Sequence, residues 1–316
     1  MIFRTEITPL QQIENQIDYK SNLFLLGSCF SNHIGDKLNY FQFNTTQNPF
    51  GILFHPYSIE KLLSDAKNKK KYSSSDLVFN NEQWHCWHAH SSLSCANKSK
   101  LLHNLNNAIL ATHKQLLQST HIIITLGTSW LYRFIEKDIL VANCHKIPQN
   151  NFVKELFSVA QITEVLLSII CLLKEVNKKA TIIFTVSPVR HLKDGFVENM
   201  QSKSHLISAI HSVLNSKEKV SYFASYEMML DDLRDYRFYA EDMIHPNQIA
   251  INYIWGKFVN TWLSESTAPI MKEIDSIKKG LLHKPFNINS LAHQKFLENL
   301  ANKKKKLLSN FPYIDF

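Results

Sequence analysis

Four short apolar runs along the chain have the pattern of strands that are buried on both faces. They are rich in β-branched or aromatic residues or are bounded by turn signals, and they span residues 23–26, 122–126, 181–186 and 220–224. Helical patterns lie between them, the clearest over residues 159–173. A further helix is expected to begin at Pro246, which suits a first helical turn. Strands that alternate with helices in this way predict a three-layer α/β/α fold around a doubly wound parallel sheet.

The pattern changes after about residue 265, where residues 264–269 form a break. Ile270, Ile274, Ile277 and Leu281 then form an amphipathic stripe, and a second helical stretch follows from Leu291. We therefore divide the chain into one domain over residues 1–265 and a helical C-terminal extension over residues 266–316. The extension is expected to pack on the domain or on a partner.

Composition and charge narrow the class of protein. The chain has 316 residues, of which 45% are hydrophobic and 20% are charged, as in ordinary globular proteins. The net charge is +8, but the lysines form local runs at 69–71 and 303–306 without interleaved aromatic residues. We interpret these runs as solvated faces and expect no nucleic-acid partner. Apolar windows such as 165–173 are shorter than a membrane span, so no membrane contact is expected.

The cysteines and the N-terminal segment favour a cytoplasmic location. There are five cysteines, an odd number without a C-x-x-C pair, which is typical of free thiols in a reducing compartment. The first residues lack a basic region followed by an apolar run, so no secretory signal is expected. The sequence indicates no cofactor, and it leaves the oligomeric state open.

Polar residues follow each predicted strand, at the sheet edge where open parallel sheets bind ligands. Residues 27–29 (Gly-Ser-Cys) follow the first strand, 127–129 (Gly-Thr-Ser) the second and 187–191 (Ser-Pro-Val-Arg-His) the third. Beyond the fourth strand comes Asp242-x-x-His245. Together these segments contain nucleophiles, a base, an orienting acid and an anion binder. Their convergence at one edge of the sheet is stronger evidence for a functional site than any single motif.

Two of these segments predict a catalytic triad. Cys29 would lie at a helix N-terminus, where backbone N–H groups lower the pKa of a thiol. The alternative is that Cys29 is simply a small hydrophobic residue buried in the core. Asp242 can turn back to hold one ring nitrogen of His245, leaving the other to act as a general base. The alternative is a turn-capping Asp242 and a surface His245. Taken together, the segments favour Cys29, His245 and Asp242 as nucleophile, base and orienting acid.

The segment from Leu26 to Ser31 resembles the name-giving motif of the GSCFA family, with Ser31 where that motif has Ala. It also aligns with the Gly-Asp-Ser-Leu-Ser block of GDSL esterases, with Cys29 at the nucleophile and Ser28 at the Asp. Residues 127–129 resemble the Gly-Thr-Asn-Asp block, and Asp242-x-x-His245 resembles the final block. Residues 48–52, 84–88, 143–148 and 185–191 also resemble GSCFA segments. The resemblance covers roughly residues 20–260.

This resemblance implies an SGNH-hydrolase-like fold and a hydrolase or acyltransferase that acts on an ester or thioester. Cys29 would be the nucleophile, with Ser28 in reserve. The oxyanion would be held by backbone or side-chain donors of Gly51, Gly127 and Ser129, the last standing where GDSL enzymes have Asn. Because Cys and Ser replace the usual residues, a catalytically silent binding or assembly protein on the same scaffold is the alternative.

Two further groups are candidates for substrate binding. In the segment 84–90, strand alternation would put His88 and His90 on one face, but the spacing fits no standard zinc site, so no metal is predicted. A pocket wall that includes His88 and His145 is the competing interpretation. Arg190 and Lys203, with Asn199, suggest an anionic group on a small acyl or carbohydrate substrate. A surface salt bridge is the alternative for these charges.

Overall fold

A computed structural model describes residues 5–8, 12, 14–214 and 219–316. Its central sheet has five parallel strands in the order β10-β9-β5-β1-β2. The strands are β1 (Asn22–Gly27), β2 (Asn44–Gln47), β5 (His121–Leu126), β9 (Thr181–Val186) and β10 (Val220–Phe223). All four predicted strands are confirmed. The strand β2 was not predicted, because its Asn-Thr-Thr-Gln sequence lies at the sheet edge and carries no apolar signal.

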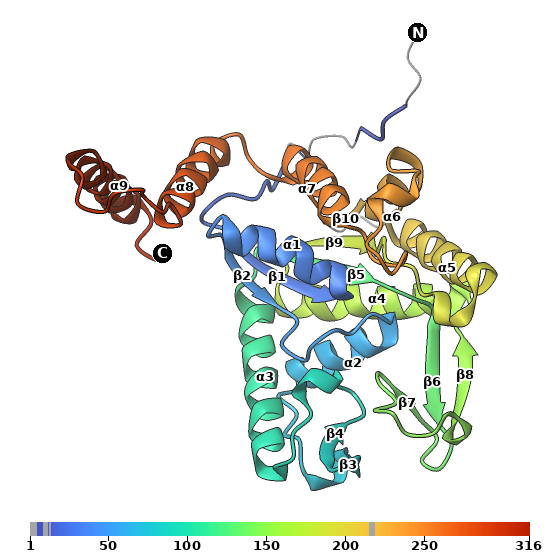
Figure 1. Ribbon diagram of the computed structural model, residues 1–316. Coiled ribbons are helices and arrows are strands. Elements are labelled where there is room, and N and C mark those ends of the chain that lie inside the picture. The colour runs from blue at the N-terminus through green and yellow to red at the C-terminus, as the bar shows by residue number, and fades with distance from the viewer. Residues whose placement is uncertain (1–4, 9–11, 13, 215–218) are drawn as a thin grey trace.

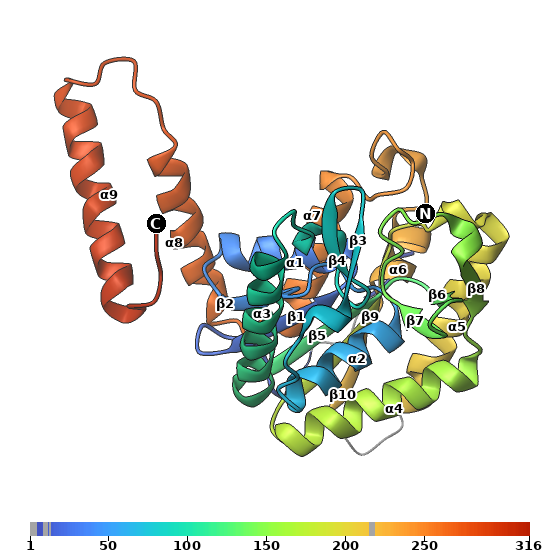
Figure 2. The same cartoon turned by 90° about the horizontal axis from the view of Figure 1, so that it is seen from below.

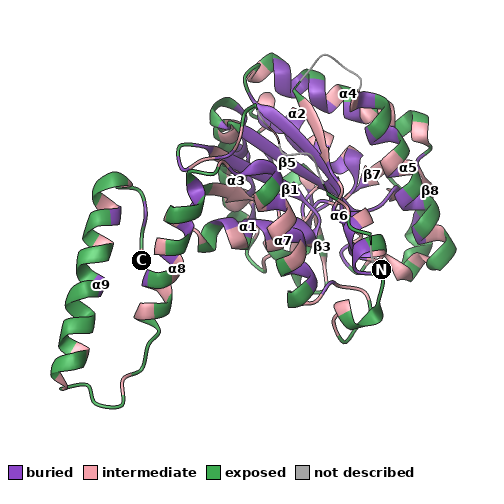
Figure 3. Cartoon of the chain, turned by 90° about the horizontal axis from the view of Figure 1, so that it is seen from above, coloured by how far each residue is buried: buried purple, intermediate pink, exposed green. Residues whose placement is uncertain are grey.

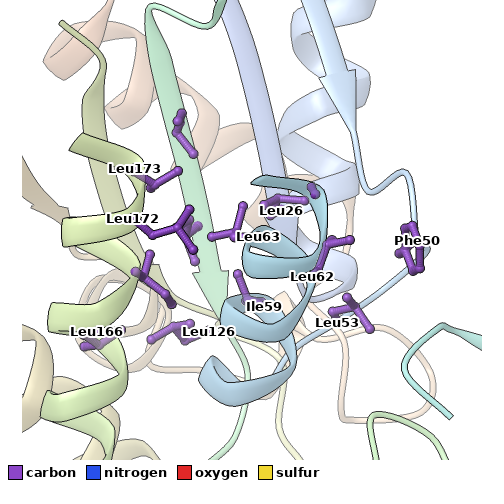
Figure 4. Close-up of a cluster of buried hydrophobic side chains, with 14 of the residues drawn as sticks. Leu26, Phe50, Leu53, Ile59, Leu62, Leu63, Leu126, Leu166, Leu172 and Leu173 are labelled. Carbon is purple, nitrogen blue, oxygen red and sulfur yellow. The ribbon is translucent and has the colours of Figure 1, made fainter. Parts of the chain in front are cut away.

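Helices cover both faces of this sheet (Figure 1). One face, with Leu23, Leu25 and Ile123, packs against α1 (Cys29–Tyr40) and α7 (Gln248–Trp262). The other, with Phe24 and Leu26, packs against α2 (Pro56–Lys67), α3 (Lys98–Gln118), α4 (Val159–Val176) and α5 (Phe196–Leu214). Successive strand side chains point to opposite faces, so each apolar run fills two cores. Figure 4 shows Leu63 of α2 and Leu172 of α4 meeting on the second face. The predicted three-layer α/β/α fold is confirmed.

Two smaller antiparallel units extend from the carboxyl-end side of the sheet (Figure 1). One is the hairpin β3 (Leu77–Asn80) and β4 (Gln83–Cys86), and the other is the sheet of β6 (Trp130–Phe134), β7 (Ile139–Val141) and β8 (Phe152–Leu156). Trp87 stacks on Phe134 with ring centroids 4.6 Å apart, and so joins the two units. The prediction of a strand over residues 84–90 is wrong beyond Cys86, because β4 ends at that residue and the chain then turns.

Short helical turns complete the domain. They are α6 (Ser225–Glu227), a π-helical turn over 228–232, and 3₁₀ turns over 74–76, 91–93, 149–151, 192–194 and 236–238. The helix expected to begin at Pro246 begins instead at Gln248. Asn247 caps it, since its side chain accepts the N–H groups of Ile249 and Ala250.

The C-terminal extension is a helical hairpin of α8 (Thr267–Leu281) and α9 (Leu291–Asn310) that projects from the domain (Figures 1 and 2). Ile274 and Ile277 of α8 are fully buried in the same apolar cluster as α1 and α7. Tyr40 of α1 donates a 2.8 Å hydrogen bond to Asp275. The outer surface of the hairpin is largely exposed (Figure 3). Over the described ranges, no helix has the length and apolarity to cross a membrane.

Candidate active site

Cys29 is the first residue of α1 and directly follows the turn at the end of β1. The turn requires glycine at position 27. Gly27 has φ of +131°, and a Cβ there would lie 2.1 Å from the backbone oxygen of Thr125. The backbone N–H of Gly27 donates to the Oδ1 of Asn48 at 2.9 Å, which fixes the turn from the side of β2. The thiol is therefore held at a helix N-terminus beside the carboxyl edge of the sheet.

Ser28 is the N-cap of α1, and its role is structural. Its Oγ accepts the N–H of Phe30 at 3.3 Å, its own N–H donates to the carbonyl of Thr125 at 3.0 Å, and its side chain is buried. Cys29 is only half-buried. Of the two candidate nucleophiles, the structure therefore leaves the sulfur of Cys29 better placed to meet a substrate.

The environment of the Cys29 thiol differs from the expectation of a lowered pKa. Burial raises the pKa of Cys29, and this effect outweighs the N–H of Phe30, the charge of Lys203 and the N–H of Cys29 itself, which lower it. The carboxylate of Asp242 raises the pKa further. The expectation was wrong because the helix N-terminus is covered by neighbouring elements, which the local sequence does not show.

Asp242 and His245 form the pair that their spacing predicts. Nδ1 of His245 lies 2.7 Å from Oδ2 of Asp242, while Oδ1 accepts the backbone N–H groups of Ile244 at 2.9 Å and His245 at 3.0 Å. The backbone bond from His245, its side-chain bond and the backbone bond from Ile244 lower the pKa of Asp242 to about 2. Since Nδ1 is engaged, Nε2 is the ring nitrogen that is free to exchange protons with a substrate.

The loop that carries this pair is fixed at both ends. The N–H of Ala240 donates to the carbonyl of His245 at 2.7 Å, and Met243 has φ of +57° at the tip. The Nδ2 of Asn247 donates to the carbonyl of Arg237 at 2.7 Å. These bonds hold the imidazole in one place, as a general base needs.

Two histidines outside the site predicted from the sequence also lie near it. His33 lies one turn after Cys29 on α1. Burial lowers the pKa of His33, the charge of Asp36 raises it, and the charge of His245 lowers it further. The charges of His245 and Asp242 act on His33 and Cys29 respectively, so this loop lies near the first turns of α1. The i, i+4 spacing of Cys29 and His33 would have revealed this neighbour.

His191 follows β9 and faces the same edge. Burial lowers its pKa to about 3, with smaller effects of Lys203 and His245, so the ring is neutral. Its Nε2 is buried and has no hydrogen-bond partner within the described part of the chain. The ring packs against Phe54 with centroids 5.3 Å apart and approaches Gly127 closely enough that a Cβ there would lie 3.1 Å from Nε2.

A cavity of about 360 Å³ extends from His191 to the sheet of β6, β7 and β8. Phe54, Trp130 and Tyr132 supply aromatic walls, and His145 supplies an imidazole. This is the size and mixed character of a small-molecule site. His145 is buried, its Nε2 lies 2.8 Å from the carbonyl of Cys86, and its ring stacks on His85.

The predicted oxyanion donors are engaged elsewhere, and this corrects the sequence-based assignment. The N–H of Gly51 donates to the carbonyl of Asn48 at 2.8 Å, and that of Gly127 donates to the carbonyl of Phe54 at 2.7 Å. Ser129 is fully buried, its Oγ donates to the carbonyl of Ser202 and its N–H donates to Ser202 Oγ, both at 2.7 Å. All of these donors are therefore engaged in hydrogen bonds within the protein. The first turn of α1 remains as the source of donors.

The substrate-binding role predicted for Lys203 and Asn199 is also corrected, because both side chains are engaged inside the protein. The helix α5 begins at Phe196, so Lys203 lies two turns inside it and not near its start. Lys203 is 0% exposed, and its Nζ donates to the carbonyl of Ser187 at 2.7 Å. The Oδ1 of Asn199 accepts the N–H of His191 at 2.8 Å and so fixes that loop.

Arg190 lies against two aromatic rings next to the loop of His245. Its guanidinium lies 4.0 Å from the ring centroid of Tyr239 and 5.1 Å from that of Tyr236. Its backbone N–H donates to the carbonyl of Ile244 at 3.2 Å, so it borders the loop of His245. None of these contacts, within the described ranges, pairs the charge with a carboxylate.

His88 lies apart from this group. Burial lowers its pKa to about 4, and the charges that act on it are Lys61, Lys70, Asp65 and Asp76, which line α2 and the turn before β3. The pocket-wall role predicted for His88 is therefore not supported by its neighbours. In the described portion of the chain, no group of three His, Cys, Asp or Glu side chains is arranged to hold a metal ion.

The fold and site are those of an α/β protein with a cysteine and an Asp–His pair at the carboxyl edge of a parallel sheet. The chain belongs to the GSCFA family, whose sequence model matches residues 22–258, and the model of the GSCFA domain protein C-terminal domain matches residues 274–316. No curated protein matches the sequence.

Among solved structures, a family 3 carbohydrate esterase of Clostridium thermocellum aligns with a TM-score of 0.36 and 9% identity, over 80% of this chain and 97% of the esterase. A carbohydrate esterase family 3 protein from Talaromyces cellulolyticus aligns with a TM-score of 0.37 and 7% identity, over 81% and 99% of the two chains.

Proposed function

We propose that this protein is an ester or thioester hydrolase, or an acyltransferase, with Cys29 as its nucleophile. The observation that carries the proposal is the 2.7 Å bond between His245 Nδ1 and Asp242 Oδ2 in a loop beside the first turn of α1. That bond leaves Nε2 of His245 to take the thiol proton of Cys29. The partner implied is a small acyl substrate.

The reaction follows from these positions. The thiol proton passes to His245 as the Sγ–C bond forms, and His245 then protonates the leaving group as its bond to the acyl carbon breaks. A water or another acceptor next gives a proton to His245 and attacks the thioester. The Sγ–C bond breaks, and His245 returns the proton to Sγ. The N–H of Cys29 supports the oxyanion. Nε2 of His191, which has no hydrogen-bond partner among the described residues, belongs to a residue that lines the cavity proposed to receive the acyl group.

Arg190 completes the proposal by holding a carboxylate or phosphate on the substrate. Its planar donors suit such a group, and its backbone adjoins the His245 loop. Lys203 is excluded from this role by its burial.

The experiment is a screen of activated acyl esters and thioesters, with and without an anionic group, on three proteins. Wild type and Cys171→Ala should turn over a responsive substrate equally, because Cys171 is an exposed thiol on α4. Cys29→Ala should lose that activity. Full turnover by Cys29→Ala would exclude Cys29 as the nucleophile.

The second candidate is a catalytically silent binding protein. It is favoured by the raised pKa of Cys29 and by the internal bonds of Gly51, Gly127 and Ser129. The two functions predict different reactivities of the Cys29 thiol. If the protein is an enzyme, the rate of Cys29 alkylation should be lower in His245→Ala than in wild type. Alkylation that does not depend on His245, together with no acyl turnover, would favour the binding protein.

A further inference from the structure

Lys203 places a fully buried ammonium group at the carboxyl end of the central sheet. Its Nζ donates to the carbonyl of Ser187, the residue after β9, and the ring centroid of Tyr226 lies 5.4 Å away. Neither contact carries a negative charge, and no ion pair of Lys203 occurs within the described ranges. A buried lysine loses its positive charge readily unless a negative charge lies nearby, so the charged form of Lys203 requires an anionic partner.

Cys29 is the group that meets this requirement. Ser187 follows β9 and Cys29 follows β1, and these two strands flank β5 on either side, so both residues lie at the same edge. Among the charged groups that act on Cys29, Lys203 has the largest effect, and Cys29 is the charged group that acts on Lys203. The amino group of Lys203, held at the carbonyl of Ser187, and the thiol of Cys29 therefore lie at the same edge of the sheet, after two strands that both pair with β5.

We propose that Lys203 is the charge partner of Cys29 and stabilises its sulfur as a thiolate when the thiol proton leaves. This inference rests on the proposed function and adds a residue to its machinery. Lys203 keeps its own proton throughout, while the thiol proton passes to His245 and on to the leaving group. When water attacks the thioester, the Sγ–C bond breaks and the thiolate returns beside the ammonium.

The surrounding charges agree with this role. Burial lowers the pKa of Lys203 to about 7, and a negative charge on Cys29 opposes that effect, so the thiolate and the ammonium support one another. The carboxylate of Asp242 disfavours the thiolate. His191, which also faces Lys203, is neutral and adds no competing charge.

The test is the pH dependence of Cys29 alkylation by iodoacetamide, followed by peptide mass spectrometry. Lys203→Met retains the length of the side chain and removes its charge. We expect alkylation at neutral pH to be at least about tenfold slower than in wild type, with the midpoint at higher pH.

Lys174→Met is the matched control. Lys174 is also largely buried and donates to a backbone carbonyl, that of Ala180, but at the opposite end of β9. The pH profile of Cys29 alkylation in Lys174→Met should equal that of the wild type. An unchanged profile in Lys203→Met, or the same loss in both variants, would overturn the proposal.

A reciprocal measurement keeps the natural lysine and needs no folded Lys203→Met protein. In Cys29→Ser the side chain is similar in size but does not ionise, so the pKa of Lys203 should fall, as read from the titration of ¹³C-labelled lysine by NMR. An unchanged lysine titration would contradict the proposal. Neither readout requires an acyl substrate, so a coupled Cys29 and Lys203 without acyl turnover would refute the proposed function alone.

Discussion

The carboxylate of Asp242 holds His245 by both of its oxygens. Oδ2 accepts from the ring Nδ1 at 2.7 Å, and Oδ1 accepts the backbone N–H of the same residue at 3.0 Å. The side chain and the main chain of His245 are thus fixed together, and the tautomer with its proton on Nδ1 is selected. Two predictions follow directly from this geometry.

Asp242→Asn should lower acyl turnover by about 10²- to 10⁴-fold, the range for loss of a positioned acid–base group. The amide can present an N–H to Nδ1 and would then favour the wrong tautomer. Asp235→Asn is the control, because Asp235 also accepts a backbone N–H two residues on, from Arg237, but at an exposed turn. Steady-state kinetics on one responsive substrate would check this, and equal rates in both variants would contradict it.

The pKa of Asp242 gives a second prediction. Because the pKa of Asp242 in the folded protein is about 2, below the ordinary aspartate value of 3.8, the hydrogen bonds stabilise the fold above pH 3.8. This stabilisation is lost as the pH falls toward 2. A ¹³C NMR titration should show this carboxyl still ionised near pH 3. In His245→Ala its pKa should rise only in part, because the two backbone bonds remain. A full return to the ordinary value would show that the ring bond dominates.

Gly27→Ala should lower the free energy of unfolding by more than about 1–3 kcal/mol, the cost of a strained backbone alone. A Cβ at this position meets the backbone of Thr125 at 2.1 Å, so β1 and β5 would have to separate. Gly256→Ala is the control, since no atom lies within 4 Å of a Cβ there and Ala favours the helix α7. Denaturant unfolding would separate the two, and equal stabilities would refute the steric argument.

Arg190→Ala should weaken the use of anionic substrates by about 1.5–3 kcal/mol, as expected for a lost charged hydrogen bond, and affect a small neutral ester less. Arg237→Ala is the control, because Arg237 also lies over an aromatic ring, that of Phe238, but is exposed. The ratio of kcat/KM values for a matched pair of anionic and neutral esters would measure this. An equal loss on both esters would make Arg190 a structural residue.

The sheet and the Asp–His pair could be predicted because their signals are local. The buried strands appear as continuous apolar runs, and Asp242 and His245 are three residues apart in one loop. The polar edge strand β2 and the small sheet of β6, β7 and β8 carry no such signal. The alternating pattern of residues 84–90 predicted a strand over the whole segment, but the chain turns after Cys86 and the strand ends there.

The misassigned residues are those whose role depends on tertiary contacts. Ser129 and Lys203 follow or face a strand end, as binding residues do, but Ser202 and the carbonyl of Ser187 engage them inside the protein. The pKa of Cys29 was misjudged for the same reason, since burial is set by elements far away in the sequence.

The most direct test of the account is the mass of the protein after brief mixing with an activated acetyl ester and quenching in acid. The account predicts the gain of one acetyl group, located on Cys29 by peptide mapping, and a faster loss of that group in wild type than in His245→Ala. Cys29→Ala should gain none at the site. Acetylation of Cys29→Ala to the same extent and at the same rate as wild type would contradict the account.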